Sequence, residues 1–379
     1  MEKGADSLSN VAVGSNKLAK YQVFVLLDSN IYCGDWFLRG APFRYLCHFL
    51  NNEGHTLLVP RVVLEEVANV RLRKFSEEAV VAGRAIAALN RLNGNDITTA
   101  STLPAAKKYE LLSLLKESIE GVVVLEYNTL PHDEIFQRAL KVQRPFREGE
   151  KGYRDTLIWM SLLAFLKTQN RPEQVAFITT NKNDFFTQSE DAEFHPDLRA
   201  DLTGANVVPF KSLAAFVDRH VDKDLHGIDR VMLRPEIESF LEDQTSEMLL
   251  GSEPQKLLWR NLAPGMRWPD DVRGSAVEIM EGVEDLEFRG IEALDDDIVY
   301  VACRYDLRIV IVTFIITRAF FEANHQALKE ESKFWETDVD NQVVTLKSSG
   351  RVYVTASFTY DKRTALFSGF SYSDVAFRT

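Results

Sequence analysis

Carboxylates that follow apolar runs are the residues of this sequence best placed to do chemistry. Asp28 comes directly after the run Val23–Leu27, and Asp184 lies shortly after the run Val175–Thr179. Asp155 opens a further apolar stretch. If the two runs are parallel strands, their carboxyl ends lie at one edge of a sheet, where open α/β sheets bind ligands. The sequence therefore predicts that these three acids meet at that edge.

A fourth acid comes from the helix expected after Pro60, where Glu65 and Glu66 lie within the first two turns. Two carboxylates about 4 Å apart repel by roughly 4 kcal/mol at an effective dielectric near 20, so a cluster of four needs a compensating cation. Oxygen ligands favour Mg²⁺ or Mn²⁺, and the absence of His and Cys from this set disfavours zinc. Such an ion lowers the pKa of a bound water and clamps the oxygens of a phosphodiester.

The elements that would position these acids alternate between strands and helices. Five strands are predicted, at Val23–Leu27, His55–Val59, Gly121–Leu125, Val175–Thr179 and Ala205–Val208. The helices between them are predicted at Val62–Lys74, Glu77–Leu92, Asp133–Val142 and Arg154–Lys167. This alternation predicts an α/β fold, a parallel sheet with helices on both faces.

The second half of the chain has a different pattern. A helix is predicted at Ile228–Leu250, an irregular stretch at Gly251–Gly274, and a further helix at about Ser275–Asp285. Alternating runs then predict an antiparallel meander, with turns at Lys347–Arg351 and Asp361–Thr364. Its strands are expected at Ile298–Tyr305, Ile309–Phe320, Gln342–Lys347, Arg351–Tyr360 and Leu366–Phe377. The predicted organisation is a mobile tail over 1–19, an α/β domain over 20–222, a helix and linker over 223–272, and a β-rich α+β domain over 273–379.

Composition and charge narrow the function classes. The 379 residues carry a net charge of −12, divided into −2 for residues 1–222 (26 Lys and Arg, 28 Asp and Glu) and −10 for 223–379 (18 and 28). An acidic second half repels polyanions, so nucleic acid is expected to meet the first half. The three cysteines have no paired spacing, which argues against a disulfide framework or a zinc motif. No apolar run is long enough to span a membrane, and a cytoplasmic protein is expected.

Four segments, in their order along the chain, give a specific resemblance. LLDSNIY, VPRVVLEEV, KGYRDTLIWMSLL and ITTNKNDFF resemble the four acidic motifs of PIN-domain nucleases. The stretch RPFREGEKGYRDTLIW is similar to a bacterial PIN-like domain family of unknown function. The similarity covers about residues 20–222. It implies a PIN-like, Rossmann-like fold and a metal-dependent nuclease, most simply an endoribonuclease, that uses Mg²⁺ or Mn²⁺.

The resemblance also assigns roles to individual residues. Asp28 matches the first metal-binding Asp of the family, and Asp155 matches the Asp that precedes Leu-Ile at the start of a buried helix. Glu66 directly precedes Val67, as the family's second motif requires, and Glu65 points about 100° away on a helix. Where the family places Asn or Asp this chain has the neutral Asn181, so Asp184 takes the fourth carboxylate role. Asp28, Glu66, Asp155 and Asp184 are thus the predicted catalytic and metal-binding residues.

A basic segment leads directly into Asp155. Between Arg138 and Arg154 it contains six Lys and Arg residues against Glu148 and Glu150. Arg144, Lys151 and Arg154 are therefore predicted to contact nucleic-acid phosphates, together with Asn181. A solvated loop and helix face explains the same charges nearly as well. The predicted substrate is RNA, with single-stranded DNA left open, because no residue visibly reads a 2′-hydroxyl group.

Other interpretations of the same residues stay open. Asp28 could cap a helix that begins at Ser29, and Asp155 could serve the helix dipole. A haloacid-dehalogenase-like phosphatase usually has a second Asp where Asn30 stands, and a receiver domain has paired acids that are missing here. A non-catalytic PIN-like scaffold is the third alternative. The acidic second half is expected to act in regulation, through a protein partner or a homo-oligomer.

Overall fold

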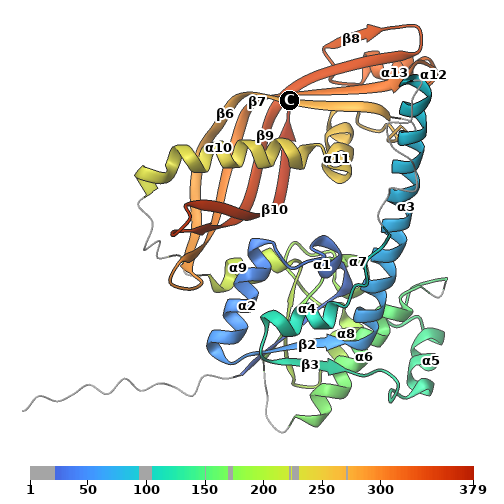
Figure 1. Cartoon of the computed structure of the whole chain (residues 1–379). Helices are drawn as coiled ribbons and strands as arrows, with labels where there is room; N and C mark the ends of the chain where they lie inside the picture. Colours follow the sequence, from blue (N-terminus) through green and yellow to red (C-terminus); the bar gives the residue numbers. More distant parts are fainter. Residues whose placement is uncertain are drawn as a thin grey trace, which may run out of the picture.

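The structure is a computed structural model that describes residues 22–93, 105–149, 151–169, 174–221, 223, 230–269 and 272–379. The predicted tail over residues 1–19 lies outside these ranges. Two sheets organise the chain, one parallel and one antiparallel, and Figure 1 shows them at opposite ends of the molecule. The predicted fold class is confirmed for both halves.

The first sheet has five parallel strands in the order β3-β2-β1-β4-β5. They are β1 (Val23–Leu27), β2 (Thr56–Pro60), β3 (Val122–Leu125), β4 (Gln174–Ile178) and β5 (Asn206–Phe210). Each lies within two residues of a predicted strand, because short, nearly continuous apolar runs suit strands covered on both faces. Strand order reverses between β1 and β4, so the carboxyl ends of these two neighbours form the switch point.

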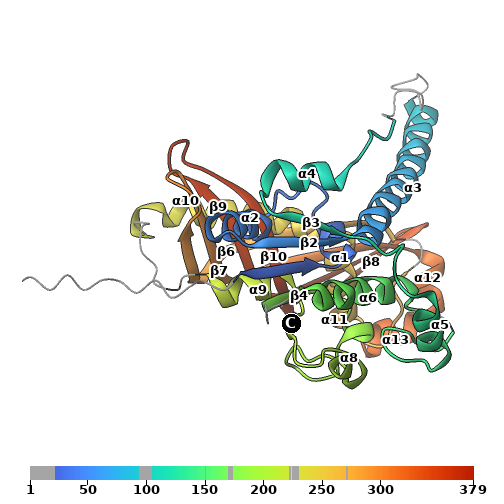
Figure 2. The ribbon, with the colours of Figure 1, turned by 90° about the horizontal axis from the view of Figure 1, so that it is seen from below.

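Helices lie on both sides of these strands, as Figure 2 shows. Helix α6 packs on β2 and β3, whereas α9 packs on β4 and β5. Their bounds are α1 (Ser29–Gly34), α2 (Ala41–Glu53), α3 (Arg61–Asn93), α4 (Leu111–Ser118), α5 (His132–Leu140), α6 (Tyr153–Thr168), α7 (Lys182–Phe185), α8 (Pro196–Asp201) and α9 (Leu213–His220).

Helix α3 corrects the prediction of two separate helices in this region. It runs unbroken for 33 residues, because neither Phe75 nor Ser76, at the predicted break, stops a helix in the way that proline does. Its fully buried residues all lie in the first two turns, the last being Val67. The outer turns extend away from the sheet (Figure 2).

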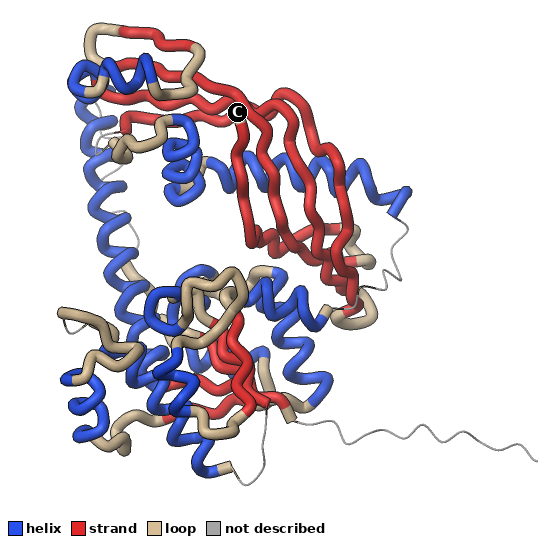
Figure 3. The backbone as a smooth tube through the Cα atoms, turned by 180° about the vertical axis from the view of Figure 1, so that it is seen from behind, coloured by secondary structure: helices blue, strands red, loops and turns tan. Residues whose placement is uncertain are grey.

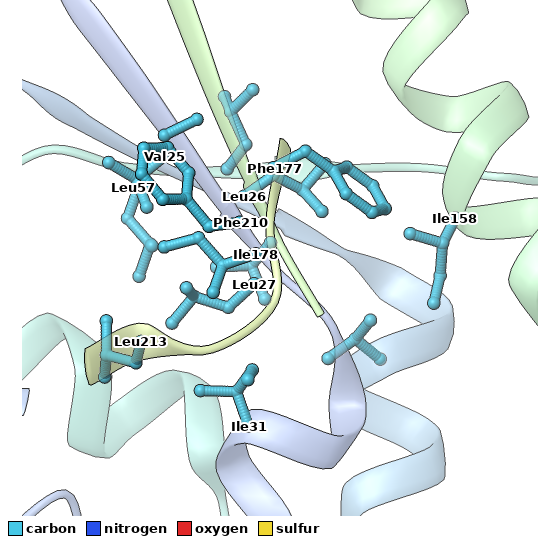
Figure 4. Packing of buried hydrophobic residues seen from close by; sticks show 14 of the residues in the cluster. Val25, Leu26, Leu27, Ile31, Leu57, Ile158, Phe177, Ile178, Phe210 and Leu213 are labelled. Carbon is cyan, nitrogen blue, oxygen red and sulfur yellow. The ribbon is translucent and has the colours of Figure 1, made fainter. Parts of the chain in front are cut away.

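The core of the first domain is formed by the strands and the helices packed on them. Figure 4 shows Leu26 of β1 and Phe177 of β4 on the side of Ile158 of α6, whereas Leu27 of β1 lies on the side of Leu213 of α9. All five side chains are at most 6% exposed. Trp159 packs edge-on against Phe177, with the ring centroids 5.8 Å apart. This packing fixes the strand ends, from which the candidate site is built.

The second sheet is antiparallel, in the order β10-β9-β7-β6, with β8 beside β9 (Figure 3). Its strands are β6 (Val272–Ala293), β7 (Ile298–Thr317), β8 (Glu336–Val339), β9 (Val343–Asp361) and β10 (Leu366–Arg378). The helices of this half are α10 (Arg230–Leu249), α11 (Ser252–Leu262), α12 (Arg318–Ala323) and α13 (His325–Glu330).

Three local predictions in this half were wrong. The helix expected at Ser275–Asp285 is part of β6, where Val277 and Ile279 are half-buried between the exposed Glu278 and Met280. The irregular stretch contains α11, which begins next to Pro254, since proline is tolerated in a first turn.

The third error concerns the turn expected at Lys347–Arg351, which is continuous strand within β9. The two runs on either side of that segment therefore form one strand, as do the two expected runs that make up β7. The turn predicted at Asp361–Thr364 is confirmed: the Asp361 carboxylate accepts from the backbone of Arg363 and Thr364 at 2.8 and 3.1 Å.

Helix α2 of the first half packs against the antiparallel sheet of the second half. Arg44 donates to the hydroxyl groups of Thr359 and Ser368 at 2.7 and 3.0 Å, and Tyr45 packs against Tyr300 with ring centroids 5.3 Å apart. Within the described ranges, no helix is both long enough and apolar enough to cross a membrane.

Candidate functional site

Asp28 lies at the switch point of the parallel sheet. Its backbone amide donates to the carbonyl of Ile178 on β4 at 3.0 Å, which anchors the end of β1 to its neighbour. The side chain is 2% exposed. Its carboxylate accepts from the Ser29 amide at 2.6 Å, the Asn30 side chain at 2.8 Å and the Thr179 hydroxyl at 2.6 Å. Asp28 therefore caps α1 and also reaches across to β4, so the capping role and a role in the site coexist.

The electrostatics of Asp28 show that a second acid is near. Burial raises the pKa of the Asp28 carboxyl, and the negative charge of Glu66 raises it further. The hydrogen bonds from Thr179 and Ser29 oppose this shift without cancelling it. The three donors from Ser29, Asn30 and Thr179 hold the Asp28 carboxylate in a fixed orientation. Hydrogen bonds to the charged form of an acid also favour that form, so they lower its pKa.

Asp155, in the first turn of α6, is coupled to all three of the other predicted acids. Burial raises its pKa, and Asp28, Asp184 and Glu66 add to the shift, bringing the pKa to about 7. The side-chain amide of Asn181 donates to Asp155 at 3.0 Å and partly offsets the shift. Residues from β1, α3, α6 and α7 thus interact electrostatically at one end of the sheet.

The two neighbouring acids of α3 point in different directions. Glu66 has a side chain 15% exposed and pairs with the guanidinium of Arg154. Glu65 is exposed and accepts from the Tyr127 hydroxyl at 2.9 Å. The structure therefore places Glu66 at the acid cluster and Glu65 away from it.

Asp184, on the short helix α7, is 3% exposed and pairs with Arg147. The Arg147 Nη2 donates to Asp184 Oδ2 at 3.1 Å, and the Nε of the same guanidinium lies against Oδ1 without a well-directed hydrogen bond. Arg147 was not among the predicted site residues. Its place in the basic segment before Asp155 was the one available signal, and it did not distinguish Arg147 from its basic neighbours.

The predicted nucleic-acid contacts occupy different positions. Arg144 is half-buried and donates to the carbonyl of Asn183 at 2.7 Å. Lys151 is exposed, and its backbone carbonyl accepts a hydrogen bond of 2.9 Å from the backbone amide of Arg147 in an isolated antiparallel bridge. Arg154 is engaged by Glu66, and Asn181 lies among the acids. Lys151 thus faces solvent and Arg144 is held by a backbone carbonyl, whereas Arg154 and Asn181 contact the acids directly.

The chemistry of this site suits a hard divalent cation. Its donors are four carboxylates with the amide of Asn181 beside them, and oxygen ligands of this kind are those that Mg²⁺ and Mn²⁺ prefer. Across the described residues, no three His, Cys, Asp or Glu side chains are grouped closely enough to hold a metal ion. In this arrangement Glu66 and Asp184 are each paired with an arginine. The donor types fit the cation, and the arginines supply the positive charge in this arrangement.

The comparisons with known proteins agree with this geometry. Residues 25–185 match the family model of the PIN domain, a span that includes all four acids. The predicted resemblance is confirmed over this region. This part of the chain is similar to PIN domains, whose fold is typically that of a nuclease. No curated protein and no solved structure matches the chain.

Proposed function

We propose that the PIN-like domain over residues 20–222 is a metal-dependent nuclease that hydrolyses phosphodiester bonds, and that it acts as an endoribonuclease. One observation carries this proposal. Asp28, Glu66, Asp155 and Asp184 come from four separate elements and are electrostatically coupled at the carboxyl edge of the sheet. Mutually repelling acids are costly to keep together, so a site that has them indicates a cation-dependent function.

The same four residues would hold Mg²⁺ or Mn²⁺. When bound, such an ion supplies Lewis-acid chemistry, since it lowers the pKa of water and stabilises negative charge on phosphate oxygens. The Asp28 carboxylate is already oriented for this role by Thr179 and Asn30. Asn181 orients Asp155 in the same way.

Two arginines contribute a second function. Arg147 and Arg154 neutralise Asp184 and Glu66 in the metal-free arrangement. A second cation, bound directly by Asp184 and Glu66, would release both guanidinium groups. Arginine binds phosphate through paired donors, so the released groups would stabilise a substrate phosphate next to the acids.

The charge distribution supports nucleic acid as the substrate. The second half of the chain repels polyanions, whereas basic residues surround the acids of the first half. RNA is the proposed strand because the resemblance to PIN-domain nucleases favours it. Single-stranded DNA is the alternative, and the assay below distinguishes the two.

The test is cleavage of end-labelled RNA and DNA in the presence of Mn²⁺. We expect the wild type to cut internal positions of RNA, and Asp28→Asn and Asp155→Asn to lose at least a hundredfold in rate. Glu117→Gln is the matched control, because Glu117 is an exposed acid on α4 of the same domain. Equal activity in all four proteins would end the nuclease proposal.

A further inference from the structure

A polar pocket of about 970 Å³ lies beside the acid cluster. Its cationic lining comes from three separate parts of the chain. Arg144 and Arg147 precede α6, Lys182 opens α7, and Lys211 follows β5 directly. The pocket therefore lies at the carboxyl edge of the sheet, on the side of β4 and β5. Glu190 is the one acid among its lining residues.

Most of this positive charge is not neutralised. Arg144 donates to a backbone carbonyl, and the Lys211 ammonium donates to the carbonyls of Ser189 and Glu190 at 2.7 and 2.5 Å. Lys182 is exposed. In the part of the chain that the structure describes, no carboxylate lies within ion-pair distance of Arg144, Lys182 or Lys211. Cations whose hydrogen-bond partners are neutral carbonyls keep their positive charge, so a pocket that they line attracts an anion.

Arg147 connects the pocket to the acids. The same guanidinium that lines the pocket also pairs with Asp184. Lys182 is only one residue beyond Asn181, the partner of Asp155. An anion in the pocket would therefore lie close to the place where the proposed cation is held.

The lining favours a phosphate over a base. Phe186, an aromatic residue of the pocket, is 5% exposed and packs against Phe194 with ring centroids 5.9 Å apart, so its ring face is not free to stack on a base. Apart from Pro196, the remaining lining residues carry charged or polar side chains, such as those of Lys182, Thr187 and Ser189. Such a surface recognises charge and carries no sequence information.

We propose that this pocket binds a backbone phosphate of the nucleic-acid strand that flanks the scissile phosphate, with Lys182 as its principal free cation. The inference rests on the proposed nuclease function and adds the path that the nucleic-acid strand takes away from the acids. The strand would leave the acids past Arg147 and α7 toward Lys211. Because the contact is to a phosphate, it is expected to act equally on every base sequence.

The experiment measures binding without cleavage. A fluorescein-labelled oligouridine of twelve nucleotides is titrated with the full chain in EDTA, and its anisotropy is followed at several salt concentrations. We expect Lys182→Gln to weaken binding about threefold to tenfold at low salt. The slope of log K against log salt should fall by about 0.7, the value for one phosphate contact on a single strand. Lys116→Gln, an exposed lysine on α4, is the matched control and should bind as the wild type does.

A second measurement locates the contact. Single phosphates of the oligonucleotide are replaced in turn by neutral methylphosphonates. For the wild type, one position should cost as much affinity as Lys182→Gln does, and the variant should show no further loss there. Absence of binding in EDTA, wild-type binding by Lys182→Gln, or equal losses at every position would each overturn the pocket proposal. Cleavage with Mn²⁺ is scored separately, so a failed pocket and a failed nuclease proposal give different results.

Discussion

Replacing Asp155 by asparagine tests directly whether the acids of the site repel one another. Burial and three neighbouring acids raise the pKa of Asp155 from 3.8 to about 7. One pKa unit corresponds to about 1.4 kcal/mol, so this shift of roughly three units costs the folded, metal-free protein up to about 4 kcal/mol above pH 7. The hydrogen bond from Asn181 is already included in that pKa. A new amide at position 155 that is left partly unpaired would cost about 1–3 kcal/mol. Asp155→Asn is therefore expected to stabilise the metal-free protein by about 2 kcal/mol.

The assay is thermal unfolding in EDTA at pH 8. A gain of about 2 kcal/mol corresponds to a rise in Tm of about 4–8 °C for a domain of this size. The pH dependence has a definite sign, because a carboxyl with a raised pKa binds more protons in the folded state than in the unfolded state. Wild-type stability should therefore fall as pH rises from about 4 to about 7, and Asp155→Asn should reduce that fall. Glu117→Gln is the control for removal of an exposed charge.

Addition of Mn²⁺ should reverse the order of the two proteins. A ligand at a hundred times its Kd stabilises the folded state by about 2.7 kcal/mol. The wild type should gain this amount, whereas Asp155→Asn should gain little because it has lost a ligand. The reasoning is refuted if Asp155→Asn is less stable than the wild type in EDTA and both respond equally to Mn²⁺.

Three further predictions follow from the same contacts. Glu66→Gln should lower the RNA cleavage rate at least tenfold and Glu65→Gln should not, since only Glu66 lies at the cluster; equal rates would contradict this. Thr179→Val removes the 2.6 Å hydrogen bond to Asp28 and should weaken Mn²⁺ binding about tenfold by calorimetry, whereas Thr179→Ser should restore it. Native mass spectrometry should find one divalent ion per wild-type chain without nucleic acid, and Arg147→Gln should bind a second ion. Two ions in the wild type would show that the paired arginines do not limit the number of bound ions.

The parallel sheet and its acids could be predicted because their signals are local. Val23–Leu27 is short and wholly apolar, which is typical of a buried central strand, and Asp28 follows it directly. The choice of Glu66 over Glu65 came from the resemblance to the second motif of PIN-domain nucleases, since the angle between neighbours on a helix shows only that one of the two faces the site. These inferences required no knowledge of which strand lies beside which, because every parallel strand presents its carboxyl end to the same edge.

The second sheet was harder to predict because its outward-facing residues conceal its pattern. In β6, Glu278 and Glu281 lie among apolar residues at spacings that also suit a helix, so the local pattern predicts a helix there. Its strand conformation depends on pairing with β7 over the whole length, and that pairing is a long-range property. The polar Lys347–Arg351 segment resembled a turn for the same reason, although β9 continues through it alongside β7.

Arg147 shows the same limit at the site itself. Nothing within the basic segment separates it from Arg144, because the distinguishing feature is Asp184, which lies 37 residues further along the chain. Only the fold reveals that one guanidinium neutralises an acid while the other donates to a backbone carbonyl. The places of the acids could therefore be predicted from the sequence more securely than the places of the cations that balance them.

The balance of charge explains how metal and substrate binding would be coupled. Above the raised pKa values of Asp28 and Asp155, when all four carboxylates are ionised, the two paired guanidinium groups of Arg147 and Arg154 leave a formal charge of −2 at the site. One divalent ion cancels that charge while both arginines stay in place. A second ion requires the arginines to leave Asp184 and Glu66, and a nucleic-acid phosphate offers them another partner. Because linkage is reciprocal, a substrate that withdraws the arginines must raise the affinity for the second ion, and that ion must raise the affinity for substrate by the same factor.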